Sequence, residues 1–403
     1  MSADTKIEWT HMPGFLPKSW NPVRGCSRIS RGCENCYAER MAARFSDLGQ
    51  PFYGYAAREK PCPDCAGVGQ RYAPVNCSTC LGTGEVPAGA RWTGRVDLIP
   101  AALDAPLRWR KPCCVFVNSM SDLFHESLSD EAIAAVFGVM AAAPQHRFLV
   151  LTKRAERMRR WFEWVGLSVE EFFDKTGHFT GAIHSQGFTP FSIGQRCQWL
   201  ANRCGDSRHW KAAGSQPWPI PNVWLGVSVE NQATADERIP QLLATHAAVR
   251  FVSYEPALAG IDFDAFLRCP ACGYTRADAG FQMDHNLCST KQPVRSIDWL
   301  IVGGESGPGA RPFDVAWARS AIEQCRQAGV PVFVKQLGAR PGAPLSAERM
   351  AQAPDCDCYD SGCRGGHGDW CQFSDRPLRL HNRKGADPAE WPEDLRVREW
   401  PHP

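Results

Sequence analysis

Short apolar segments recur along this chain, and each of them ends in a polar cluster. They are rich in Val, Ile, Leu and Phe, as expected of β-strands buried on both faces, and most are followed by a segment with helical periodicity. Six such segments are CVFVNSMSD from Cys114, RFLVLTKR from Arg147, VWLGVSVEN from Val223, VRFVSYEP from Val249, DWLIVGGES from Asp298 and PVFVKQLG from Pro331.

Amphipathic helices are predicted between these strands. The segments LSDEAIAAVFGVMAAAP and VAWARSAIEQCRQAG have apolar residues at helical spacing, and Gly329 ends the second as a C-cap. Strands that alternate with helices form a parallel sheet with right-handed crossovers. The pattern therefore predicts an α/β fold, a complete or partial (β/α) barrel.

Polar residues gather where the six predicted strands end. In a (β/α) barrel or an open α/β sheet these carboxyl ends meet at one mouth, where binding sites are usually built. We therefore expect a site formed by residues from these ends: Asn118, Ser119 and Asp122; Thr152 and Lys153; Ser228, Glu230 and Asn231; Ser253 and Glu255; Glu305 and Ser306; Lys335 and Gln336.

The composition is that of a globular protein of 403 residues, with 44% hydrophobic and 22% charged residues. A formal net charge of +2 excludes the bulk basicity that supports unspecific nucleic-acid binding. The N-terminus lacks a basic region followed by an apolar one, and no window approaches 18 consecutive apolar residues. We expect a cytoplasmic protein with no membrane partner; its oligomeric state stays open.

Nineteen cysteines, most of them clustered, indicate metal sites, because disulfides are disfavoured in a reducing compartment. The first cluster is WNPVRGCSRISRGCENCYAER, with Cys26, Cys33 and Cys36 on a loop that enters a helix at about Cys36. Three cysteines at the mouth of a barrel suit a 4Fe-4S cluster whose fourth iron stays open for a non-protein ligand. A zinc ion would need a fourth ligand, such as His11 or His125.

The second cluster consists of two copies of C-x-x-C-x-G-x-G, with Cys62, Cys65, Cys77 and Cys80. Each C-x-x-C is a tight turn that offers two thiolates to one ion, so the pair predicts a tetrahedral zinc site. The repeat resembles the zinc-binding repeats of DnaJ-type chaperones.

Two further clusters have less regular spacing. A C-x2-C-x12-H-x2-C arrangement predicts a second zinc site, with a surface role for its histidine as the alternative; its residues are Cys269, Cys272, His285 and Cys288. The ligands of a third metal stay open among Cys356, Cys358, Cys363, His367 and Cys371.

The cysteine clusters divide the predicted barrel into segments. Residues 1–58 hold the three-cysteine loop, 59–90 form a zinc-ribbon insertion, and 91–265 with 295–340 form the barrel core. Residues 266–294 are a second zinc-binding insertion, and 341–403 are a cysteine-rich loop with a closing segment.

The three-cysteine loop before a (β/α) core resembles the radical SAM enzymes. Their common motif is C-x3-C-x2-C with an aromatic residue before the third cysteine, whereas here the first gap is six and Tyr37 follows the third. Blocks along nearly the whole core, including WNPVRGCSRISRGCENCYAER, VNSMSDLFHE, FLVLTKRAERM, WLIVGGESGPGARP and RKGADPAEWPEDLRVREWP, are similar to the phage gp thirty-seven / gp sixty-eight family of phage and prophage proteins.

The resemblance implies a radical SAM fold and an enzyme that generates a 5′-deoxyadenosyl radical. Cys26, Cys33 and Cys36 would hold the cluster, and Asp122 or Lys153 would lie nearer the substrate. The resemblance also implies a reductant such as flavodoxin or ferredoxin, and S-adenosylmethionine (SAM) bound by Ser228, Glu230, Gly303, Gly304, Glu305 and Ser306. For Gly303 and Gly304 a tight turn from strand to loop is the alternative.

The sequence does not identify the substrate, although the resemblance to phage proteins favours a nucleobase, nucleotide or nucleic acid. The alternative function is a zinc-dependent nucleic-acid-binding protein without radical chemistry, in which the opening cysteines hold zinc.

Overall fold

The computed structural model describes residues 5–62, 64, 80, 85–165, 219–268, 273, 275, 277, 296–342, 378 and 380–401. The chain divides into two compact units. The first consists of Met1–Ser228, Asp236–Val252 and Arg295–Asp298, and the second of Val229–Ala235, Ser253–Val294 and Trp299–Pro403.

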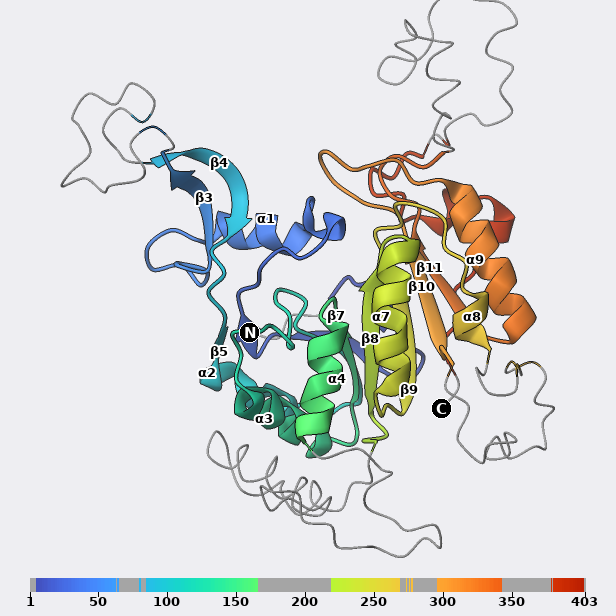
Figure 1. Cartoon of the computed structure of the whole chain (residues 1–403), viewed down its shortest axis with the longest axis horizontal. Helices are drawn as coiled ribbons and strands as arrows, with labels where there is room; N and C mark the ends of the chain where they lie inside the picture. The colour runs from blue at the N-terminus through green and yellow to red at the C-terminus, as the bar shows by residue number, and fades with distance from the viewer. Residues whose placement is uncertain are drawn as a thin grey trace, which may run out of the picture. The chain divides into compact units, whose positions relative to one another are not determined.

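The fold is built on a seven-stranded sheet that curls into a half-barrel. The pairs β1 with β6, β6 with β7, β7 with β8 and β10 with β11 are all parallel (Figure 1). This confirms the α/β class, and the curled half-barrel is compatible with the predicted partial (β/α) barrel. The six predicted strands are the last six of the sheet. In sheet order the strands are β1 (Leu16–Trp20), β6 (Cys113–Val117), β7 (Arg147–Thr152), β8 (Val223–Val229), β9 (Val249–Tyr254), β10 (Trp299–Gly303) and β11 (Val332–Gln336).

Strand β1 is absent from the sequence prediction, because its sequence LPKSW contains a proline and a lysine. The structure explains how this segment becomes a strand: β1 is first in the sheet order, and an edge strand tolerates a proline whose missing N–H faces away from the ladder. The Asn118 N–H donates to the Trp20 carbonyl at 2.8 Å, which continues the pairing of β1 and β6 beyond their ends.

The helices begin and end at residues suited to those positions. Helix α3 has Ser129 as N-cap, whose hydroxyl accepts from the Ala132 N–H, and α9 ends at Gly329 in the left-handed region as predicted. The described helices are α1 (Tyr37–Arg44), α2 (Pro100–Leu103), α3 (Asp130–Ala141), α4 (Ala155–Trp164), α7 (Gln232–Ala244), α8 (Asp264–Leu267) and α9 (Val315–Ala328).

The core of the first unit is centred on β8, in which every residue is buried. Gly226 lies in the middle of this strand, where a Cβ atom would come within 2.5 Å of the Phe251 ring. The glycine therefore makes room for an aromatic side chain from β9.

Two antiparallel ribbons lie outside the main sheet. Strand β2 (Val23–Arg24) pairs with β5 (Asp97–Leu98), and β3 (Ala56–Pro61) pairs with β4 (Glu85–Trp92). Helix α1 contacts both β3 and β4 (Figure 1). The three-cysteine loop runs from β2 to α1, so these ribbons support its two ends.

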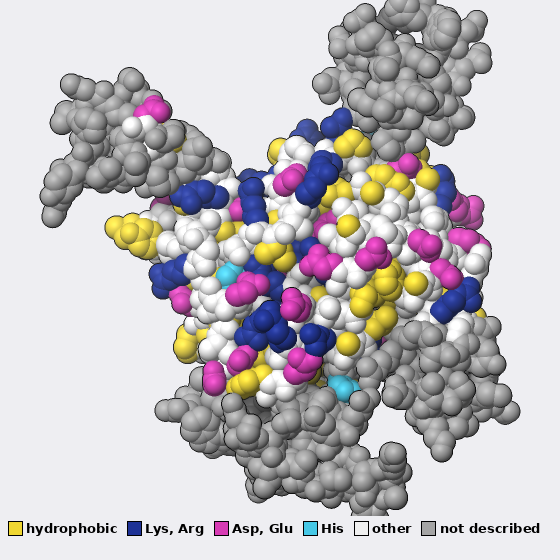
Figure 2. Space-filling model, in the orientation of Figure 1, with side chains coloured by type: hydrophobic (Ala, Val, Ile, Leu, Met, Phe, Trp, Pro, Cys, Tyr) yellow, Lys and Arg dark blue, Asp and Glu magenta, His cyan; other side chains and the backbone are white. Residues whose placement is uncertain are grey.

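Acidic and basic side chains of the described residues are interspersed on the face drawn in Figure 2. This distribution agrees with the formal net charge of +2. In the part of the chain that the structure describes, no helix is long and apolar enough to cross a membrane.

Candidate functional site: a cysteine loop with a buried ionic network

The three cysteines of the opening motif lie on one loop and its helix start. Cys26 follows β2, Cys33 ends the 3-10 helix η2 (Arg31–Cys33), and Cys36 is the N-cap residue of α1. The Cys36 N–H donates to the Cys33 carbonyl at 3.3 Å. Cys26 and Cys36 both pack against one apolar cluster, which contains Ala38, Ala42, Ala43, Ala56 and Trp92.

Burial keeps two of these thiols protonated at neutral pH. Burial, and after it the Asp122 carboxylate, raises the pKa of Cys26 to about 12, while Arg154 opposes the shift. Burial also raises the pKa of Cys36, although backbone N–H groups at the start of α1 favour its thiolate. A metal that binds here must therefore displace protons.

Three cations interact electrostatically with the cysteines of the loop. Arg154 acts on Cys26, and Lys153 acts on Cys36. Arg28 interacts electrostatically with the other two thiols of the loop, Cys33 and Cys36. A cluster held by three thiolates is anionic, so this arrangement of charges would stabilise it.

The donor set fits an iron-sulfur cluster in chemistry, because thiolates are its usual ligands. Among the described residues, no group of three or more His, Cys, Asp or Glu side chains is already arranged to hold a metal ion.

The histidines suggested as a fourth zinc ligand have other contacts. The Ser127 N–H donates to His125 Nδ1 at 3.2 Å, so the His125 proton lies on Nε2, which donates to Ser27 Oγ at 2.8 Å. His11 contacts the backbone carbonyl of Thr5 at 3.2 Å.

Asp122, predicted to be catalytic, is the centre of a buried network. Its carboxylate accepts from the Thr152 hydroxyl at 2.7 Å, the Phe124 N–H at 3.0 Å and the Lys153 N–H at 3.3 Å. It also forms an ion pair with Arg154 at 3.0 Å, in which the two side chains are 9% and 3% exposed. These bonds orient Asp122 towards Arg154.

Arg154 connects this network to the cysteine loop. Its guanidinium donates to the Ser27 carbonyl at 3.1 Å and to the Ser27 hydroxyl at 2.8 Å, and it lies 3.9 Å from Cys26 Sγ. It also pairs with Glu126 at 2.8 Å. Sequence reasoning missed Arg154, although it directly follows the predicted site residue Lys153 in the polar run after β7.

A second missed residue, Glu39, fixes the other end of the loop. Its carboxylate is buried in α1 and accepts from Arg28 Nε at 2.9 Å and from the Trp92 N–H at 2.8 Å. Glu39 thus ties the loop and the start of α1 to strand β4. A charged residue on the apolar side of an amphipathic helix was the available signal.

Two predicted site residues at neighbouring strand ends are in contact. The Lys153 ammonium, after β7, donates to the Ser228 hydroxyl on β8. Because Lys153 also acts on Cys36, the structure brings this pair into the electrostatic surroundings of the cysteine loop.

The other predicted SAM-binding residues belong to the second unit. Glu305 accepts from three N–H groups of Arg311, including Nη2 at 2.7 Å, and this pair is largely buried. Gly304 is required by packing, since a Cβ there would lie 2.5 Å from the Leu337 carbonyl oxygen. Cofactor binding by this set stays a prediction: Glu230, Gly303, Gly304, Glu305 and Ser306.

Sequence reasoning named Glu255 and Lys335 as strand-end residues without pairing them. They form an ion pair at 2.7 Å in the second unit. Gln336 also donates to Glu255, at 3.2 Å. Their place at the ends of β9 and β11 was visible in the sequence, whereas their pairing was not.

Of the four predicted ligands of the zinc ribbon, the first and the last are described. Cys62 and Cys80 are buried together, with Val86 packed against them, at the end of the β3–β4 hairpin. The remaining predicted zinc ligands lie outside the described residues: Cys65, Cys77, Cys269, Cys272, His285 and Cys288. The third cluster also lies outside: Cys356, Cys358, Cys363, His367 and Cys371.

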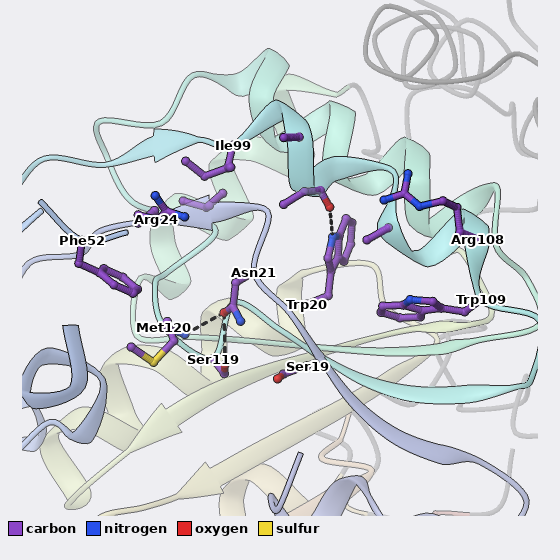
Figure 3. Close-up of a pocket in the computed structure, with 14 residues that line it drawn as sticks. Ser19, Trp20, Asn21, Arg24, Phe52, Ile99, Arg108, Trp109, Ser119 and Met120 are labelled. Atoms are coloured by element: carbon purple, nitrogen blue, oxygen red, sulfur yellow. Dashed lines mark hydrogen bonds between the residues drawn. The ribbon is translucent and has the colours of Figure 1, made fainter. Parts of the chain in front are cut away.

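A cavity of about 800 Å³ lies beside the end of β1 in the same unit (Figure 3). Sequence analysis did not predict it, because its lining comes from segments far apart in the chain. The lining includes Trp20, Asn21, Arg24, Phe52, Trp109 and Ser119.

Fold and site together define a half-barrel α/β protein with a cysteine loop held by a buried ionic network. The chain belongs to the DUF5131 family, described as a protein of unknown function, whose sequence model matches residues 4–361. Comparison with curated proteins and with solved structures found no match to the chain.

Proposed function

We propose that this chain is an iron-sulfur enzyme of the radical SAM type. The observation that supports it most is that Cys26, Cys33 and Cys36 share one loop, and that Arg154, Lys153 and Arg28 interact with them electrostatically. Three thiolates would hold a 4Fe-4S cluster and leave one iron for SAM. A half-barrel of parallel strands agrees with this class, and the shared fold alone would not be sufficient.

When bound, the reduced cluster and SAM supply a 5′-deoxyadenosyl radical that removes a hydrogen atom from a substrate. The residues of this chain bind and orient. Lys153 and Ser228 offer an ammonium and a hydroxyl that suit a carboxylate such as that of SAM. Arg154 holds the Ser27 backbone, and thereby the position of Cys26. The apolar cluster behind Cys26 and Cys36 limits access of water.

The proposal includes a reductant, flavodoxin or ferredoxin, and a cytoplasmic setting in which free thiols persist. A zinc ion in the β3–β4 ribbon would have a structural role. The burial of Cys62 with Cys80 supports this, since the outer cysteines of the two C-x-x-C turns must meet around one ion.

Anaerobic reconstitution tests the proposal. The full chain should bind about four irons and four sulfides, and after reduction with dithionite it should convert SAM to 5′-deoxyadenosine. Cys33→Ala should abolish both the cluster and the product. Cys325→Ala, which removes a buried thiol from α9, is the matched control and should retain both.

Two results would reject the assignment. A Cys26, Cys33 and Cys36 triple alanine variant that keeps its iron would place the cluster elsewhere. A colourless wild-type protein that contains zinc alone and releases no 5′-deoxyadenosine would favour the zinc-dependent nucleic-acid-binding alternative.

A further inference from the structure

We propose that the cavity beside β1 binds a nucleotide, with its base between aromatic side chains and its phosphate near arginine. That this nucleotide is the substrate rests on the function proposed above; nucleotide binding itself does not. A volume of about 800 Å³ is within the roughly 300–1,000 Å³ typical of small-molecule sites.

The cavity offers aromatic rings whose positions are fixed by their neighbours. Figure 3 shows Phe52 on one side and Trp20 with Trp109 on the other. The Trp109 ring contacts His146 at a centroid distance of 5.5 Å, and the Phe52 ring contacts Trp92 at 6.4 Å. Both Phe52 and Trp109 are half-buried, so part of each ring remains accessible for stacking.

Trp20 lines the cavity in a different way. It is 2% exposed, and its indole N–H donates to the Ala102 carbonyl at 2.8 Å. It therefore supplies apolar surface, while Phe52 and Trp109 are the candidates for contact with the base.

The orientation of the Asn21 amide follows from its contacts. Its Oδ1 accepts from the Met120 N–H at 3.0 Å and from the Ser119 hydroxyl at 3.2 Å. A backbone N–H can only donate, so the Asn21 amide oxygen must face Met120. The Asn21 NH₂ group therefore points away from Met120. This NH₂ can donate to a carbonyl or ring nitrogen at the edge of a base.

Two arginines give the cavity affinity for an anion. The Arg24 guanidinium lies over the Phe52 ring at 5.4 Å and over the Tyr55 ring at 5.7 Å. Arg108 is 60% exposed and pairs with Asp104. Among the described residues Arg24 is held by these rings and by no carboxylate, so its guanidinium N–H donors suit a phosphate. Aromatic faces, an amide and a guanidinium together match a nucleotide better than a plain aromatic molecule or a sugar phosphate.

The cavity shares a wall with the cysteine loop. Met120 lines the cavity and packs against the same apolar cluster as Cys26 and Cys36. The Tyr37 hydroxyl, one residue after Cys36, donates to the Ser119 carbonyl at 2.6 Å. A nucleotide in the cavity would therefore lie next to the loop proposed to hold the cluster.

Calorimetry on the full chain without iron tests binding separately from chemistry. The probes are AMP, GMP, CMP and UMP, with ribose 5-phosphate as the control that lacks a base. At least one nucleotide should bind more tightly than ribose 5-phosphate. Trp109→Ala should weaken that nucleotide roughly fivefold to hundredfold, as expected for loss of one stacking ring. Trp109→Leu, which keeps more of the apolar volume, should weaken it as well.

Arg24→Ala should also weaken the nucleotide, about tenfold or more. Arg95→Ala is its matched control, because Arg95 lies over the same Tyr55 ring without lining the cavity. Trp164→Ala, at the end of α4, is the control for Trp109. Both controls should bind the nucleotide as the wild type does.

Three outcomes would overturn the proposal. The first is that no nucleotide binds more tightly than ribose 5-phosphate, and the second is that folded Trp109→Leu and Arg24→Ala bind the nucleotide like the wild type. The third is that SAM displaces the nucleotide, which would assign the cavity to the cosubstrate. Nucleotide binding by a protein that never accepts iron would support the cavity while rejecting the proposed radical chemistry. A chain that makes 5′-deoxyadenosine and binds no nucleotide would support the radical chemistry and reject the nucleotide site.

Discussion

Replacing Arg154 by methionine tests whether the buried ionic network holds the cysteine loop. The substitution keeps much of the side-chain length and removes the charge that faces Asp122. The Asp122 side chain is 9% exposed, so its carboxylate would remain buried without its ion-pair partner. The Ser27 carbonyl and hydroxyl would lose their Arg154 donors at the same time.

The expected loss in the free energy of unfolding follows from these contacts. Removing one partner of a buried pair costs about 3–5 kcal/mol. The bond to Glu126 adds about 0–1 kcal/mol, because the Glu126 side chain is 61% exposed. Asp122 keeps its bonds to Thr152 and to two backbone N–H groups, which lowers the cost. We therefore expect a loss of about 3 kcal/mol.

Urea unfolding followed by circular dichroism measures this loss. Arg160→Met on the same helix is the matched control, because Arg160 pairs with Glu156 at 3.7 Å and both side chains are more than half exposed. The control should change the unfolding free energy by less than about 1 kcal/mol. Asp122→Asn combined with Arg154→Met should cost less than the sum of the two single changes.

A local measurement separates loop release from global destabilisation. Amide hydrogen exchange, resolved by peptide mass spectrometry under native conditions, should become faster in residues 26–36 of Arg154→Met, while exchange in α9 stays unchanged. If Arg154→Met unfolds at the same urea concentration as Arg160→Met and residues 26–36 exchange at the wild-type rate, the network does not hold the loop.

Three further predictions concern other parts of the chain. Burial lowers the pKa of His146, so its contribution to stability is present above about pH 6.5 and is lost as pH falls; His146→Gln should flatten this decline in urea unfolding at a series of pH values. Gly226→Ala should destabilise the fold by about 1–3 kcal/mol, since its methyl group would meet the Phe251 ring; an unchanged melting curve would contradict this. Cys62→Ser with Cys65→Ser should release about one zinc per chain, measured by mass spectrometry of the metals, while the iron-sulfur absorbance persists.

The sheet could be predicted from sequence where strands are apolar throughout. β8 and β10 are buried at every position, and such runs between helical patterns have few other interpretations. β1 could not be predicted, because at the edge of a sheet an exposed Leu16 and a proline replace the apolar run.

The three cysteines of the candidate site could be recognised from the sequence, whereas the residues that hold their loop in place could not. The spacing of Cys26, Cys33 and Cys36 is visible in one stretch of sequence. The bond from Arg154 to Ser27 joins residues 127 positions apart, and no local pattern indicates which strand end will reach the loop. For the same reason Asp122 could be recognised as a residue of the mouth, whereas its hydrogen bonds to Thr152 and Arg154 became visible only in the fold.

The β3–β4 hairpin has a consequence for how proteins with this fold can vary. Lys60 pairs with Val86 and Pro61 with Glu85, so the chain leaves and rejoins the fold at two adjacent points. The entropy of closing a loop grows only slowly with its length, so this junction imposes little limit on what is inserted. The open end of the β3–β4 hairpin can therefore accommodate insertions of different length. Relatives can be expected to carry a longer ribbon here, or a simple two-residue turn, while the cysteine loop and the half-barrel stay the same.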